Sequence, residues 1–389
     1  MKKKIVLKTF LPLVAFLMVF TSCQKTNKQT KNAPIYKKKY KEEILKSRDD
    51  LRSYLISSSV PGMSVCVSID GEIVWSEGIG VASKELKAPA TRETKFRIGN
   101  ASEILTSYLI AKLHEQGKLD LTHSFYKYVP NFPKKKYDFT LLELGSSVSG
   151  FRDMKMEDLV KYKDLKNLKE YVQKLENDTL VYEPDTYFND SEYNYALLGI
   201  LAENIGNEKF SKLVKNQILD TLNIENTLID YQHVIIPNRS ETYYRDFIAR
   251  LIKAPEVNML PFAPTLGYLS TADDLNQLAQ QILTPGFFNQ ETLDLFYNKH
   301  RLSGGQEVLR SFGWISTTDR FNRKLIAKLG TTIGGSSAVG IFPDQKLVVT
   351  LCSNLGDDIG ELPIAKIADK FLEKLDPMKE MNEEKKSSK

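Results

Sequence analysis

The chain is short of the features that would place it in several common classes. Its 389 residues include only 3 cysteines, too few for a small fold held together by disulfides. Glycine (21) and proline (15) stay near average frequency and no segment repeats, which excludes collagen-like and solenoid architectures. The apolar run Thr9–Phe20 is too short for a spanning helix, which needs roughly 20 residues. With 42% hydrophobic and 26% charged residues, the chain can bury a large core.

Acidic residues are missing from the first 41 positions. Four lysines lie within residues 1–22 and seven within 23–41, which leaves 43 of the 54 Lys and Arg residues against 49 acids in the rest of the chain. The overall charge of +5 therefore hides a remainder with a charge of −6. Because the positive charge belongs to the N-terminal segment, we expect no nucleic-acid partner.

The N-terminal segment has the order of a bacterial secretion signal. Lysines 2–4 precede the apolar run, which ends in Phe20-Thr21-Ser22-Cys23. This ending resembles a lipobox, in which the cysteine is acylated and becomes the first mature residue; the alternative is an ordinary signal peptide with an incidental cysteine. We predict a lipoprotein signal peptide over 1–22, lipidation of Cys23 and a flexible tether over 23–36. The protein would then be a lipid-anchored membrane lipoprotein of the cell envelope, periplasmic or outer-membrane.

Hydrophobic periodicity predicts an α+β fold. Apolar residues recur at helical spacing near both ends, over 40–57 and 362–375, and residues 102–283 are mostly helical in pattern. Runs rich in β-formers cover 63–69, 72–75, 325–328, 337–342 and 346–352. These runs can form one five-stranded antiparallel sheet, flanked by the terminal helices, only if the helical middle is an insertion. We expect one domain over 37–376, a helical subdomain of about 102–310 inserted in the sheet, and a disordered charged tail over 377–389.

A series of short motifs resembles the serine β-lactamase and penicillin-binding-protein family, above all its class C β-lactamase, DD-peptidase and esterase branch. The motifs are, in chain order, Val60-Pro61-Gly62, Phe96-Arg97-Ile98-Gly99, Gly117-Lys118-Leu119-Asp120-Leu121, Ser149-Gly150-Phe151, Tyr195-Ala196-Leu197-Leu198-Gly199, GYLSTADDL at 267–275 and Phe312-Gly313-Trp314. The resemblance covers about residues 60–354 and rests on their order and spacing. It implies a β-lactamase/transpeptidase-like α/β sandwich with a ligand cleft between sheet and helical subdomain.

The family's first catalytic motif, S-x-x-K, is altered. Its serine is the acyl nucleophile, and its lysine lies one helical turn on, where it can take the serine's proton. The matching segment is Asn100-Ala101-Ser102-Glu103, so an amide replaces the nucleophile and an acid replaces the lysine. Ser102 is no substitute, because it points about 200° around a helix from the nucleophile position. A literal S-x-x-K at 124–127 aligns with a surface turn.

The second and third motifs are altered as well. Y-x-N is matched by Asp190-Ser191-Glu192; a rival register at 187–189 would change the loop length after Glu183-Pro184. K-T-G is matched by Lys328-Leu329-Gly330, which keeps the cation and the glycine and loses the hydroxyl. Removing a nucleophile or its base typically lowers a rate by about 10⁴–10⁶-fold, so the combined changes predict an inactive domain.

The alignment brings Glu103, Asp190 and Glu192 together near Lys328. Carboxylates at close range raise one another's pKa, while the lysine lowers it. Three interpretations stay open: an ion-pair cluster without a ligand, a pocket that prefers a cation, an amine or a sugar, and hydrolysis by water that a carboxylate activates.

These alterations favour a pseudoenzyme that acts by binding. Its candidate pocket consists of the degenerate positions Asn100, Glu103, Asp190, Glu192, Lys328 and Gly330. A peptidoglycan-related small molecule or an envelope protein would be the partner. The alternative is a weak or noncanonical serine hydrolase, such as a β-lactamase, a D-Ala-D-Ala carboxypeptidase or an esterase. No metal or other cofactor is expected, since the histidines lie outside the motifs. The family's strand order makes the strands of Cys66 and Cys352 neighbours, and we expect free thiols there.

Overall fold

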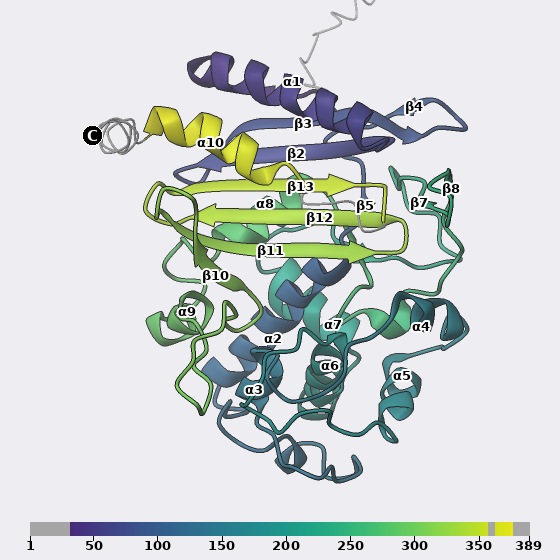
Figure 1. Cartoon of the computed structure of the whole chain (residues 1–389), viewed down its shortest axis with the longest axis vertical. Coiled ribbons are helices and arrows are strands. Elements are labelled where there is room, and N and C mark those ends of the chain that lie inside the picture. Colours follow the sequence, from purple (N-terminus) through teal and green to yellow (C-terminus); the bar gives the residue numbers. More distant parts are fainter. Residues whose placement is uncertain (1–31, 357–361, 376–389) are drawn as a thin grey trace, which may run out of the picture. The chain divides into compact units, whose positions relative to one another are not determined.

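The computed structural model describes residues 32–356 and 362–375. These residues form three layers (Figure 1): helices α1 (Lys41–Ser57) and α10 (Ile364–Leu375), a central sheet, and a helical region on the sheet's other face. A compact unit begins at Asn32. The predicted signal peptide, Cys23 and the predicted tail over 377–389 lie outside the described residues.

The central sheet has the strand order β1-β3-β2-β13-β12-β11-β10. Its long strands are antiparallel to their neighbours: β2 (Gly62–Ile69), β3 (Glu72–Ser83), β11 (Lys324–Thr332), β12 (Gly335–Phe342) and β13 (Leu347–Ser353). Leu351 of β13 pairs with Val65 on one side and with Ala338 on the other. The first and last parts of the chain therefore share one sheet, which confirms the predicted α+β fold.

Three short strands extend this sheet beyond the five that the sequence predicts. β1 (Ile35–Tyr36) and β4 (Ala88–Pro89) pair with β3, and β10 (Ile315–Thr318) pairs with β11. β1 lies within the segment 23–36 that the sequence assigns to a flexible tether, so Ile35 and Tyr36 belong to the sheet instead. Two to four residues carry too little periodicity to reveal such strands.

The helical region occupies the chain between β5 (Phe96–Arg97) and β10. Its helices are α2 (Glu103–Glu115), α3 (Leu141–Gly145), α4 (Met156–Lys161), α5 (Leu168–Leu175), α6 (Glu192–Gly206), α7 (Phe210–Val214), α8 (Ala272–Gln280) and α9 (Gln290–Tyr297). It also holds two small sheets, formed by β5, β9 (Tyr268–Ser270) and β6 (Leu228–Ile229), and by β7 (Tyr243–Arg245) and β8 (Leu251–Lys253). Short helical turns cover Lys38–Tyr40, Gly99–Ser102, Phe125–Lys127, Lys215–Leu219 and Leu260–Phe262.

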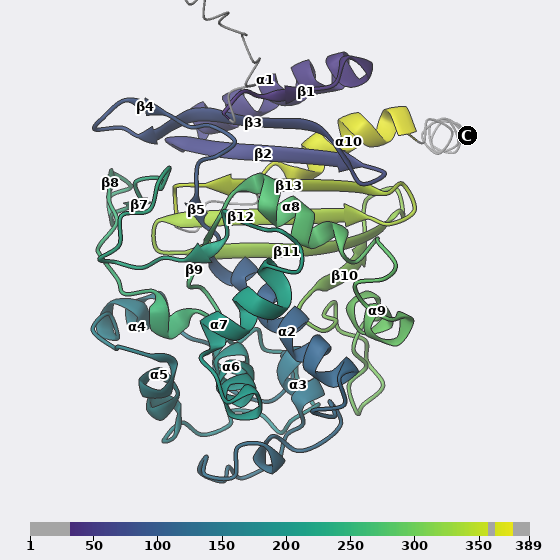
Figure 2. The same ribbon diagram turned by 180° about the vertical axis from the view of Figure 1, so that it is seen from behind.

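Two hydrophobic cores lie on the two faces of the sheet. The smaller core joins the sheet to α1 and α10, with Ile44 and Phe371 fully buried. The larger core joins it to the helical region, and α8 lies across the sheet there (Figure 2). Cys66 and Cys352 belong to this larger core as free thiols, as predicted, and burial raises the pKa of both.

The structure has one further property that concerns membranes. Among residues 32–356 and 362–375, no helix combines the length and the hydropathy that a bilayer-spanning segment needs.

Candidate functional site

The candidate site forms where β11 approaches the turn that starts α2. A Cβ atom at Gly330 would clash with the carbonyl oxygen of Ile98 and would lie 2.7 Å from the backbone nitrogen of Ala101. Only glycine permits such an approach. Gly99 also has a positive φ of 55°, which lets the chain turn from β5 into α2. The two glycines thus place Asn100 beside the end of β11.

A buried ion pair occupies the centre of the site. The ammonium of Lys328 on β11 contacts the carboxylate of Glu103 in the first turn of α2, and their side chains are only 2% and 3% exposed. Burial lowers the pKa of Lys328, and the charge of Glu103 opposes this effect. Because an uncompensated buried charge is strongly destabilising, each of these two groups depends on the other.

Asn100 connects the surrounding groups through its amide. Its Nδ2 donates to Glu192 Oε1 at 3.1 Å and to Glu103 Oε1 at 3.4 Å. Its Oδ1 accepts a hydrogen bond from the backbone N–H of Thr331 at 3.3 Å. The amide thus uses both its donor and its acceptor, and it joins α2, β11 and the start of α6.

Glu192 is an acid that this environment keeps protonated. Burial is the main cause that raises its pKa from 4.5 to about 8, and the carboxylates of Asp153 and Glu103 add to it. Its Oε2 atom is buried. Its other oxygen, Oε1, accepts a hydrogen bond from Asn100. The carboxylate in direct contact with Lys328 is that of Glu103.

Asp190 pairs with a cation that the sequence did not indicate. It contacts the guanidinium of Arg310 and accepts a hydrogen bond from Ser147 Oγ at 3.3 Å, and 44% of its side chain is exposed. Burial lowers the pKa of Arg310, and the charge of Glu103 opposes this. The structure therefore brings Asn100, Glu103, Glu192 and Lys328 together, and it pairs Asp190 with Arg310 rather than with Lys328. The only signal for Arg310 was its position just before the motif at 312–314.

A comparison with known families decides what this architecture is. The family model described as Beta-lactamase matches residues 44–372, most of the chain. The chain belongs to the β-lactamase family. The human mitochondrial serine beta-lactamase-like protein LACTB is 26% identical, over 80% of this chain and 74% of the relative. Protein flp of Staphylococcus aureus is 24% identical, over 77% of this chain and 60% of its own length.

Solved structures of the β-lactamase family share the fold. A penicillin-binding protein homologue from Pyrococcus abyssi, described as octameric, has a TM-score of 0.74 at 22% identity and covers 85% of this chain and 77% of its own. A class C β-lactamase has a TM-score of 0.71 at 19% identity, over 86% of this chain and 96% of its own. At these identities the likeness concerns the fold alone.

Other candidate groups of the β-lactamase-family motifs lie elsewhere. In the rival Y-x-N register, the ring centre of Tyr187 lies 4.5 Å from that of Tyr182, with the rings tilted by 32°, and Asn189 donates to the carbonyl of Phe151 at 2.6 Å. In the literal S-x-x-K, Ser124 donates to Asp138 at 2.6 Å on the surface. Ser102 Oγ accepts from the N–H of Tyr268. Within the described ranges, no serine hydroxyl hydrogen-bonds to a lysine.

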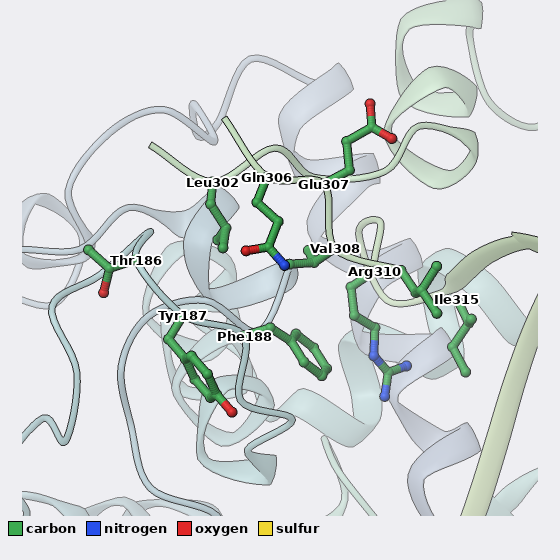
Figure 3. A pocket seen from close by; sticks show the side chains of 10 residues that line it. Thr186, Tyr187, Phe188, Leu302, Gln306, Glu307, Val308, Arg310 and Ile315 are labelled. Carbon is green, nitrogen blue, oxygen red and sulfur yellow. The ribbon is translucent and has the colours of Figure 1, made fainter. Parts of the chain in front are cut away.

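A pocket of about 440 Å³ opens beside Arg310 (Figure 3). One wall is the segment 186–188 and the other is the segment 302–310, with Ile315 of β10 beside it. The side chain of Gln306 points into the pocket, and the ring of Phe188 lies 5.6 Å from the guanidinium carbon of Arg310. Two contacts join the two sides of the pocket: the ion pair of Asp190 with Arg310, and a hydrogen bond of 2.6 Å between Asp185 and His300 Nε2. This size and mixed lining suit a small molecule.

Metal binding finds no support in the described part of the chain. No group of three or more His, Cys, Asp or Glu side chains there is arranged to hold a metal ion. The acids of the candidate site are instead committed to Lys328, Asn100 and Arg310.

Proposed function

We propose that this protein is a catalytically inactive member of the β-lactamase family that acts by binding, and that a lipid on Cys23 holds it at the cell envelope. The observation that carries the first part is the buried Lys328–Glu103 ion pair beside Asn100. At the position where the family has its nucleophile, this chain has an amide that is already hydrogen-bonded on both sides.

Each catalytic role lacks a suitable group in this arrangement. An amide cannot form the acyl intermediate that a serine forms. A general base must accept a proton. The contact with Glu103 favours the charged ammonium of Lys328, and an ammonium has no free electron pair with which to accept one. At the position of the family's tyrosine, the carboxylate of Asp190 is paired with Arg310. These contacts supply stability where the family has reactivity.

Binding has a structural basis in the pocket beside the site. Its volume of about 440 Å³ falls within the usual range for small ligands, and its walls offer both apolar and polar groups. We propose a peptidoglycan-related small molecule or an envelope protein as the partner. The ending of residues 20–23 and the short segment between Cys23 and β1 support the anchor and the location.

The experiment that tests inactivity is intact-mass spectrometry of residues 24–389, which contain the whole compact unit. The protein is incubated with benzylpenicillin and, separately, with a fluorophosphonate. We expect no covalent adduct with either reagent. An adduct on the unmodified sequence would overturn the proposal and favour a noncanonical serine hydrolase.

A double reversion provides the positive control. Asn100→Ser with Glu103→Lys restores the nucleophile and its neighbouring lysine. The variant has a second lysine beside Lys328, and Glu192 remains as the nearby carboxyl group whose negative charge can offset the two ammonium groups. An adduct on this variant alone would show that the cleft still accepts the reagent. Asn100→Ser alone should stay unreactive, because it lacks the base. The lipid is tested separately, as a mass increase of the cysteine-containing peptide that Cys23→Ser abolishes.

A further inference from the structure

Three loops and the last turn of α1 expose large apolar side chains to solvent. Phe247 is 95% exposed and Ile235 is 96% exposed, values close to those of an unfolded chain. Ile56 and Leu86 are about four-fifths exposed. We call the set of Ile56, Leu86, Val234, Ile235, Phe247 and Ile248 the apolar rim. Single exposed apolar residues are ordinary, but a group of this kind marks an interaction surface.

The members of the apolar rim gather around the β7–β8 hairpin. The Tyr243 hydroxyl of β7 accepts from the N–H of Lys84, in the turn that carries Leu86. Arg245 donates to the carbonyl of Ser58, at the end of the helix that carries Ile56. Gln232, next to the loop of Ile235, hydrogen-bonds to Glu256 just beyond β8 at 3.2 Å. Figures 1 and 2 accordingly place β4 and the β7–β8 hairpin at the same end of the molecule.

The tip of the hairpin is held by hydrogen bonds and an ion pair among its own residues, 246–250. The N–H groups of Ile248 and Arg250 donate to the carboxylate of Asp246, and the N–H of Ala249 donates to its carbonyl oxygen. Arg250 also forms an ion pair with Asp246. Polar backbone groups that enter an apolar medium must be satisfied internally, and the N–H groups of Ile248, Ala249 and Arg250 already are. Phe247 and Ile248 can therefore leave water without stranding these donors.

The chain that precedes the described residues indicates which partner covers this surface. Eleven residues lie between Cys23 and Ile35, and the twelve steps from one to the other can span about 40 Å when extended. β1 pairs with β3 at Ser76, and β3 continues toward the turn that carries Leu86. A bilayer that holds the lipid of Cys23 therefore lies within reach of the apolar rim. Two cations beside the hairpin are paired with acids, Lys253 with Glu241 and Arg250 with Asp246, so we do not expect attraction to anionic lipid to be the main force.

We propose that the apolar rim inserts into the lipid surface on which the protein is anchored. Phe247 and Ile235 would be the principal contacts, and they would fix the orientation of the domain on the membrane. This inference rests on the proposed envelope location, yet it concerns a surface separate from the degenerate site. The anchor brings the domain to the membrane, and the rim decides which end of the domain faces it.

The test is a vesicle flotation assay with residues 24–389, which lack Cys23, so that the result does not depend on lipidation. Vesicles of phosphatidylcholine alone and vesicles that also contain phosphatidylglycerol are compared at low and high salt. Phe247→Ser and Ile235→Ser remove two rim side chains. Tyr187→Ser is the matched control, because it removes another exposed ring, in the pocket beside β10 at the opposite edge of the sheet.

We expect the unmodified protein to float with both kinds of vesicle at both salt concentrations. Each rim variant should lower the partition coefficient about tenfold, and the control should not change it. Failure to float, or equal flotation of the rim variants, would overturn the proposal. Binding only to anionic vesicles, lost at high salt, would also overturn it, since charge would then suffice. So would a dimer formed without lipid that Phe247→Ser dissociates, because a second copy would then be the occupant.

Discussion

Glu192 is a buried acid whose proton has a measurable effect on stability. Burial raises its pKa from 4.5 to about 8, so between these values the folded chain binds more protons at this group than the unfolded chain does. This group therefore lowers the free energy of unfolding as the pH rises through that window. Glu192→Gln keeps the shape and removes the titration, and it should be no less stable than the parent at about pH 5 and more stable at about pH 8.5. Urea unfolding at both pH values tests this, and parallel pH profiles would contradict it.

The ion pair of Glu103 and Lys328 should behave as one unit. Glu103→Gln leaves a buried ammonium without its partner, which typically costs about 3–5 kcal/mol of unfolding free energy. The loss should be smaller above the pKa of Glu192, because this neighbour can then ionise and take over the charge balance.

The double variant Glu103→Gln/Lys328→Met is the matching control for this pair. It removes both charges, so it should recover most of the stability that Glu103→Gln loses. A double-mutant cycle by urea unfolding measures the coupling. If the stability losses of Glu103→Gln and of Lys328→Met simply added up in the double variant, the two groups would not depend on each other.

At the scale of elements, β11 and the turn before α2 are held together by a close backbone approach at Gly330. Gly330→Ala should destabilise the protein by about 1–3 kcal/mol or more, because the added methyl group meets backbone atoms that cannot move aside. Gly304→Ala is the matched control, since its added Cβ has no neighbour within 4 Å. Urea unfolding of both variants is the measurement. Equal stability of the two would show that β11 can shift without cost.

The sequence predicts those elements whose pattern is long enough to repeat. The central strands and both terminal helices have periodic apolar residues, and Asp70-Gly71 takes the positive φ values that a tight hairpin turn requires. The edge strands β1, β4 and β10 have two to four residues and depend on a neighbour for their hydrogen bonds. The spacing of the motifs could indicate which residues share the site. It could not show that Asp190 pairs with Arg310, because a partner far along the chain leaves no local pattern.

At the scale of the whole molecule, the sheet and the helical region share one continuous core. Arg97 links them at its margin: its Nε forms an ion pair with Asp230 at 2.6 Å, and its Nη1 donates to the carbonyl of Ile333 at 2.8 Å. Asp230 lies in the helical region, and Ile333 lies between β11 and β12. Arg97, Asp230 and Ile333 are all buried, so separation of the two regions would expose a charge pair as well as apolar surface. We therefore expect the two regions to unfold together.

The thiols of Cys66 and Cys352 report whether that expectation is right. Both are buried in the larger core, on the face of the sheet that the helical region covers, and burial raises their pKa. A thiol reagent should therefore label neither in the native protein, and along a urea series the labelled fraction should rise over the same range in which far-ultraviolet circular dichroism is lost. Residues 24–389 with Cys66→Ser and Cys352→Ser give the zero level. Labelling that precedes the loss of secondary structure would mean that the helical region leaves the sheet first, because only that movement uncovers the thiols while the strands stay paired.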